Sequence, residues 1–171
     1  MSANKQPAPW LRVRSSDVPA VIRAVLDALE LAREDLSTWC GGLSDVELNA
    51  RPAGIAPVAF HLRHISRSID RLLTYAEGQS LDERQTAALQ SELSPSATKE
   101  EVFAELNSAL DKGAYRIERL SWTDLEGKRT VGRKQLPTSV AGLLVHIAEH
   151  TQRHVGQAIT TSKVVVDQRR S

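Results

Sequence analysis

The sequence predicts an all-α protein built as a four-helix bundle with long connections between its helices. Three observations support this fold class. Four segments of roughly twenty residues carry apolar side chains at alternating steps of three and four, which is the spacing of a buried helix face. Caps, glycines or prolines bound these segments. No long strand-like alternation is present, although residues 128–136 would suit a small hairpin.

The length of the chain and of its connections sets the domain organisation. At 171 residues the chain can bury an ordinary core, so we expect one domain over residues 1–171, with an N-terminal arm at 1–15 and a C-terminal tail at 166–171. All three connections exceed the roughly two to eight residues usual between helices of a bundle. A topology with a crossover is therefore compatible with the sequence.

The first helix is expected from Ser16, a suitable N-cap, to about Thr38, with Pro19 in its first turn. Gly41 and Gly42 follow its end. Its apolar stripe consists of Val18, Val21, Val25, Leu29, Ala32 and Leu36.

The second helix is expected to open at Pro57 and to stop before Gly78. The segment in front of it, residues 43–57, is irregular with room for one short helical turn. The apolar stripe of this helix consists of Val58, Leu62, Ile65, Ile69, Leu72 and Ala76.

The third helix begins with a capping box formed by Thr98 and Glu101. Residues 79–97 before it hold a weak helical stretch and then the breaker Ser94-Pro95-Ser96. Gly113 lies inside the apolar stripe, where it costs helix stability and points to a close approach of another helix. The stripe consists of Val102, Leu106, Ala109, Leu110, Gly113, Ile117 and Leu120.

The fourth helix is capped by Thr138 or Ser139 and is expected to run to about Val164. The loop before it is basic, and we interpret it as a solvated loop in preference to an anion site. The basic residues are Lys128, Arg129, Arg133 and Lys134, and the apolar stripe of the helix is Val140, Leu143, Leu144, Ile147, Thr151, Val155 and Ala158.

Composition excludes several functional classes. The net charge is +1, which does not fit an electrostatic nucleic-acid binder. The sequence has no secretory signal and no apolar run long enough for a membrane span, so we expect a cytoplasmic protein. Cys40 is the single cysteine, and we interpret it as a small buried apolar residue rather than a nucleophile.

All five histidines fall in two short segments, one in each of the second and fourth helices. His150 and His154 are four residues apart, so their imidazoles can reach one ion, whereas His146 drifts toward solvent. A third ligand would come from His61 or His64. Helical angle alone slightly favours His61, and the spacing does not decide between them.

The spacing of His150 and His154 is that of the H-E-x-x-H motif, but the glutamate of a zinc peptidase is missing. No general base is recognisable. We expect Glu149 to point to another side of the helix, Gln157 to be a surface residue or a hydrogen-bond donor to a ligand, and Tyr75 to serve in packing.

Two segments, PVAFHLRHISRSIDRLLTYAEG and HIAEHTQRHVGQAITT, resemble the DinB/YfiT-like superfamily of metal-dependent four-helix proteins. The resemblance is clearest over residues 56–78 and 136–164. It implies one divalent metal ion held by His64, His150 and His154, with His61 as the alternate ligand from the second helix. His146 has no counterpart in the motif.

The resemblance also implies a metal with open coordination positions and a metal-dependent enzyme of the thiol S-transferase type. A small-molecule substrate, above all a low-molecular-weight thiol, is then the expected partner, and the family often forms homodimers. Zinc is the default ion, and nickel or iron would also suit imidazole ligands. Two alternatives stay open: a non-catalytic, metal-stabilised bundle that acts as a binding or sensor module, and a polar pocket without metal.

Overall fold

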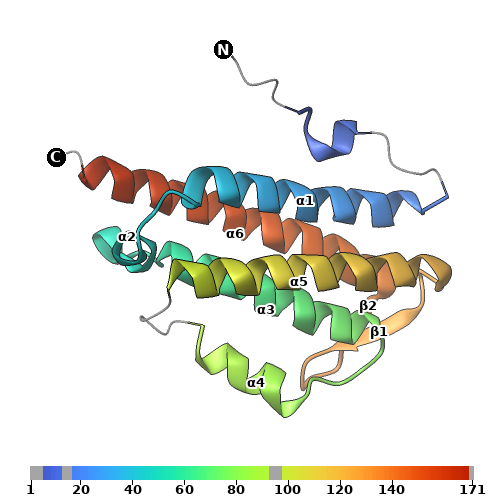
Figure 1. Cartoon of the computed structure of the whole chain (residues 1–171). Coiled ribbons are helices and arrows are strands. Elements are labelled where there is room, and N and C mark those ends of the chain that lie inside the picture. The colour runs from blue at the N-terminus through green and yellow to red at the C-terminus, as the bar shows by residue number, and fades with distance from the viewer. Residues whose placement is uncertain (1–5, 13–16, 93–97, 170–171) are drawn as a thin grey trace.

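The computed structural model describes residues 6–12, 17–92 and 98–169. Within these ranges the predicted four-helix bundle is present, and its connections carry two short helices and one hairpin (Figure 1). The long helices are α1 (Ala20–Cys40), α3 (Val58–Ala76), α5 (Lys99–Arg119) and α6 (Val140–Gln168). The elements of the connections are α2 (Asp45–Asn49), α4 (Glu83–Gln90), β1 (Lys128–Val131) and β2 (Leu136–Ser139), together with short 3₁₀ turns at Pro52–Gly54 and Leu120–Trp122. A further 3₁₀ turn, Pro9–Leu11, precedes α1.

The helices form two parallel pairs. Gln152 and Ser162 on α6 donate to the carbonyls of Ala28 and Trp39 on α1, so these two helices run in the same direction. Figure 1 shows that α3 and α5 also share a direction, opposite to that of α1 and α6. The chain must therefore cross the length of the bundle between α3 and α5, which is the crossover that the long connections allowed.

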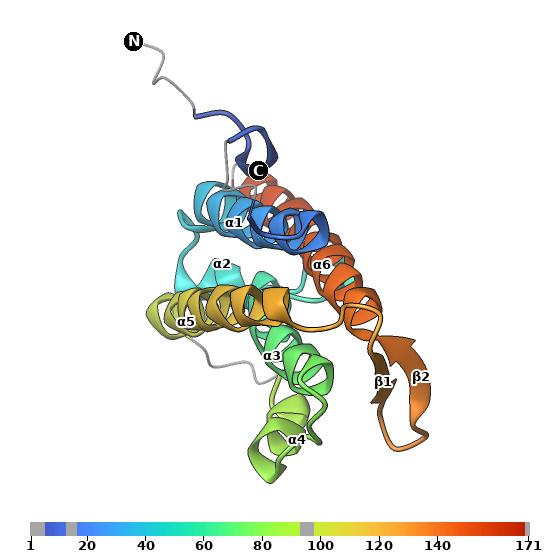
Figure 2. The ribbon, with the colours of Figure 1, turned by 90° about the vertical axis from the view of Figure 1, so that its right-hand side faces the viewer.

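The crossover runs back along the outer side of α3, where α4 lies beneath the bundle in the end-on view (Figure 2). Polar contacts hold it there. The side-chain amide of Gln85 donates to the side chains of Asp70 and Thr74, each at 2.8 Å. Arg67 donates to the backbone carbonyl of Ala88 at 2.8 Å. Later residues of the connection contact earlier residues of α3, so the connection runs antiparallel to the helix that it covers.

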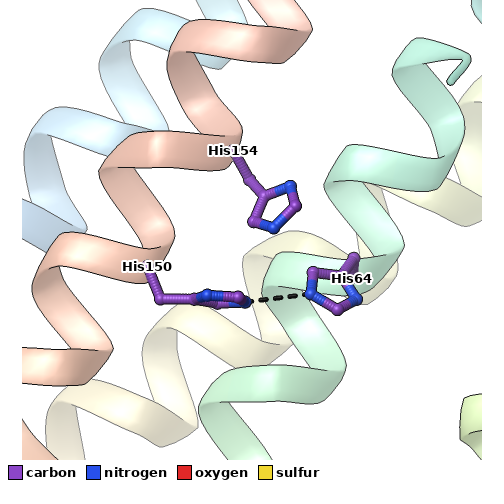
Figure 3. Close-up of side chains that lie close together, drawn as sticks. All are labelled: His64, His150 and His154. Atoms are coloured by element: carbon purple, nitrogen blue, oxygen red, sulfur yellow. Dashed lines mark hydrogen bonds between the residues drawn. The ribbon is translucent and has the colours of Figure 1, made fainter. Parts of the chain in front are cut away.

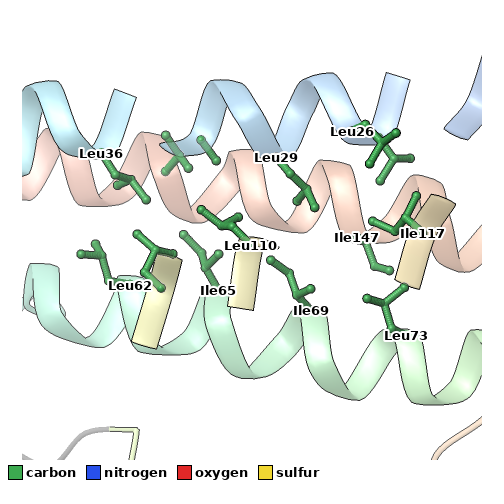
Figure 4. Close-up of a cluster of buried hydrophobic side chains, with 14 of the residues drawn as sticks. Leu26, Leu29, Leu36, Leu62, Ile65, Ile69, Leu73, Leu110, Ile117 and Ile147 are labelled. Carbon is green, nitrogen blue, oxygen red and sulfur yellow. The ribbon is translucent and has the colours of Figure 1, made fainter. Parts of the chain in front are cut away.

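The core is a single apolar cluster between the four long helices (Figure 4). Each long helix contributes fully or almost fully buried aliphatic side chains, and burial of each such side chain is worth about 1.5–3 kcal/mol. Representative members are Leu29 and Leu36 of α1, Leu62, Ile65, Ile69 and Leu73 of α3, Leu110 and Ile117 of α5, and Ile147 of α6.

Most of the predicted boundary signals are confirmed. Thr98 forms the expected capping box with Glu101, and the hydroxyl of Ser139 accepts from the amide of Gly142 to cap α6. Gly78 has a φ of 78°, a left-handed conformation that ends α3. The candidate hairpin is longer than expected, since β2 continues to Ser139.

Other predicted boundaries need correction. Pro19 is the N-cap of α1 and not part of its first turn, and the predicted cap Ser16 lies outside the described residues, as does Ser94-Pro95-Ser96. The last helix continues to Gln168, because Val165 is still buried against the core, so the expected tail from residue 166 begins within the helix.

One predicted member of each of two apolar stripes is replaced by its neighbour in the sequence, while most of the other members are buried as expected. Ile22 and Leu73 are fully buried, whereas the predicted Val21 and Leu72 are only partly buried. In the basic loop, the guanidinium of Arg129 donates to the carbonyl of Ala76 at the end of α3, and the other basic residues of the loop are exposed. None of the described helices has both the length and the apolar character that a membrane span needs.

Gly113→Ala should destabilise the fold, although alanine is the better helix former. The new Cβ would lie 2.8 Å from Cγ2 of Ile69, which is buried and β-branched and cannot swing away. Crowding of this kind costs about 1–3 kcal/mol in a packed core. Urea unfolding measures the change.

Gly156→Ala is the matched control, because no neighbouring atom lies within 4 Å of a Cβ at that position on α6. This change should raise the free energy of unfolding by about 0.5–1 kcal/mol. If both variants gain stability equally, the close approach of α3 and α5 at Gly113 is wrong.

Candidate metal centre

The antiparallel contact between α3 and α6 brings the two histidine segments together. Nε2 of His64 lies 2.9 Å from Nε2 of His150. Each of His64, His150 and His154 offers one ring nitrogen, and these three atoms all lie within 4.8 Å of one another. Figure 3 shows a ring nitrogen of His154 directed toward the other two rings. We call these three residues the histidine cluster.

His61, the alternate ligand, lies beside the histidine cluster but is not a member of it. Its side chain is buried, as the helical angle indicated, and its Nδ1 lies 3.0 Å from Nδ1 of His154. The ring of His154 therefore lies between His61 on one side and the other two members of the cluster on the other. The cluster contains His64, the residue that the family resemblance favours, and does not contain His61, the residue that helical angle favours.

The remaining candidate residues are not members of the cluster, although the ring of His146 lies 5.5 Å from that of His150. His146 is half-exposed, and its Nδ1 lies 2.9 Å from a carboxylate oxygen of Glu149. Gln157 is exposed, and Tyr75 packs at the edge of the core. Cys40 is fully buried, and burial raises the pKa of its thiol to about 11, so it is not a reactive nucleophile at neutral pH.

Glu92, which no sequence pattern indicated, contacts the histidine cluster from the crossover connection. The carboxylate is only 6 % exposed and accepts from Nδ1 of His64 at 2.6 Å and from Arg71 at 2.9 Å. Burial alone would raise its pKa, but the hydrogen bonds from His64 and Arg71 lower it below the usual range. A lone glutamate 28 residues from His64 carries no local signal of this contact.

The rings of His61, His150 and His154 are held in their neutral form at neutral pH. Burial, followed by the charges of neighbouring groups, lowers the pKa of His61, His150 and His154 to about 4 in each case. A neutral imidazole is the form that binds a metal. The site is therefore ready to accept a cation at neutral pH without first releasing protons from these three rings.

The histidine cluster offers three imidazole ligands to a divalent ion, and one of its nitrogen pairs already has a suitable spacing. Two nitrogens bound to one ion at 2.0–2.1 Å lie about 3.3 Å apart at a tetrahedral angle, which is close to the 2.9 Å between His64 and His150. The donor set is three imidazoles, and the carboxylate of Glu92 already occupies the second nitrogen of His64. Three protein ligands leave coordination positions open, as in catalytic zinc sites.

The chain matches one known protein family. A family model described as the DinB superfamily matches residues 28–158, which is most of the chain and contains the whole histidine cluster. No curated protein and no solved structure matches the chain.

The rings of His61, His150 and His154 should still be neutral at about pH 5.5 in the metal-free folded protein, because their pKa is lowered to about 4. In the urea-unfolded chain they should titrate near the ordinary value of about 6.5. ¹⁵N NMR of the ring nitrogens measures both states. If the rings titrate in the folded protein at nearly the same pH as in the unfolded chain, then burial does not lower their pKa as described.

The same shifts fix the sign of the pH dependence of stability. Between about pH 6.5 and 4 the unfolded chain binds more protons than the folded one. The free energy of unfolding should therefore fall as the pH is lowered through this range, which urea unfolding in the presence of a chelator can follow.

Proposed function

Because this chain belongs to the DinB superfamily, we propose that it binds one divalent metal ion through His64, His150 and His154 and acts on a small thiol as a metal-dependent transferase. The observation that carries the proposal is the approach of three imidazole nitrogens from two helices to within 4.8 Å. Zinc is the ion we expect, since an open three-histidine site is typical of catalytic zinc.

The chain supplies a neutral donor set. Three uncharged imidazoles leave the full positive charge of the cation in the site, which favours an anionic ligand at an open position. A bound ion of this kind lowers the pKa of a coordinated water or thiol and so supplies a nucleophile near neutral pH. This electrostatic preference supports a thiol as the substrate class.

A non-catalytic role is the second candidate, and one observation favours it. Glu149 is exposed and pairs with His146 and Arg153, while Glu92 is fully engaged by His64 and Arg71. Neither carboxylate is free to serve as a general base. In this alternative the cation would join α3 to α6 and stabilise the bundle as a binding or sensor module.

Alanine at His64, His150 or His154 is expected to lower the zinc content of untagged protein from about one equivalent per chain to less than about a tenth, because two imidazoles hold the ion far more weakly than three. His146→Ala is the matched control on the same helix and should keep the wild-type content. His61→Ala should also retain zinc. Elemental analysis of protein from zinc-supplemented cultures decides, and an equal loss in His146→Ala would overturn the ligand assignment.

Turnover separates the two candidate functions. The zinc-loaded protein should accelerate conjugation of a cellular thiol with an electrophile, and His150→Ala should abolish the acceleration. A panel of low-molecular-weight thiols with a chromogenic electrophile provides the assay. Conjugation at the rate of the metal-free background for every thiol would favour the binding module.

A further inference from the structure

We propose that Glu92, held by Arg71, is a positioning residue for the metal ligand His64: it keeps the proton of that ring on Nδ1 and so directs the lone pair of Nε2 into the histidine cluster. This inference rests on the proposed metal site. It also gives a role to the crossover connection, which contains Glu92 but none of the three proposed ligands.

The carboxylate of Glu92 is divided between two partners. One oxygen accepts from Nδ1 of His64 at 2.6 Å, and the other accepts from Nη1 of Arg71 at 2.9 Å. Arg71 is itself anchored by the hydroxyl of Ser68 at 3.2 Å. The side chains of Glu92 and Arg71 are only 6 % and 11 % exposed. The carboxylate is therefore fixed in place and shielded from competing water.

These contacts determine which nitrogen of His64 carries the proton. An ionised carboxylate can only accept hydrogen bonds, so Nδ1 of His64 must be the donor. In the neutral ring, Nε2 then bears the lone pair, and this is the atom that lies 2.9 Å from Nε2 of His150. A carboxylate behind a ligand imidazole fixes its tautomer and orientation and increases its basicity.

The fold brings Glu92 to this position through several contacts along α3. Arg67 donates to the carbonyl of Ala88 and to the hydroxyl of Ser91, the residue immediately before Glu92. One turn further along α3, Arg71 receives the carboxylate itself. Thus α3 supplies the ligand, the arginine that holds the carboxylate and the arginine that anchors its backbone.

Glu92→Gln is the sharpest test because it preserves the shape of the side chain. Arg71 can only donate, so it should take the amide oxygen, and the amide NH₂ group should then face Nδ1 of His64. We expect the proton of the His64 ring to move from Nδ1 to Nε2, the atom that the metal would need. ¹⁵N NMR of the metal-free protein at about pH 8, where an ordinary imidazole is neutral, reads the tautomer directly.

Glu105→Gln is the matched control. Glu105 pairs with Arg67 on the same side of α3 at 2.7 Å, so the substitution makes the same chemical change without touching His64. This variant should leave the proton of His64 on Nδ1. Glu92→Ala, which has neither oxygen nor amide, should give a mixture of tautomers if it folds.

Zinc affinity is the second measurement. Competition with a chromogenic chelator should show a loss of about 10–100-fold for Glu92→Gln and wild-type affinity for Glu105→Gln. An unchanged tautomer or an unchanged affinity in Glu92→Gln would overturn the positioning role. If the wild-type protein binds no zinc at all, the proposed function fails, and the NMR result on the metal-free protein still decides what Glu92 does.

Discussion

The register between α3 and α6 is the constraint on which the site depends. The two helices run antiparallel, so His64 meets His150 while His61, one turn earlier, meets His154 one turn later. A rotation of either helix by one residue would turn its imidazoles by about 100° and separate the rings. The apolar side chains that flank the histidines on α3, Leu62 and Ile65, are fully buried and hold this register.

The histidines carry an energetic cost that the core must offset. Each of these imidazoles takes a place on the α3–α6 interface that an aliphatic side chain could fill, and a buried polar group left without a partner costs about 1–3 kcal/mol. The rings reduce the cost by pairing, His61 with His154 and His64 with His150 and Glu92. Such a concentration of polar groups in a helix interface is typical of a functional site rather than of a device for stability.

The sequence predicts the bundle well because its helices bury long, regular stripes, and the clear signals for their ends, such as Thr98 and Gly78, have local causes. The three predicted histidines lie together in the fold. Helical spacing and the family resemblance select the same pair of them on α6. Choosing His64 over His61 required the resemblance, since both lie near the apolar face. Glu92 could not be found, because its contact with His64 depends on the path of a connection and not on any periodicity.

The crossover therefore has a meaning beyond the order in which helices are joined. A simplified bundle with tight hairpin loops could keep α3, α6 and all three imidazoles, yet no polypeptide would pass behind His64 to carry a carboxylate there. Engineers who transplant only the helices of the histidine cluster into a minimal scaffold would inherit the three imidazoles without the carboxylate that contacts one of them. In this protein, the path of the chain between α3 and α5 determines which side chains surround the histidine cluster.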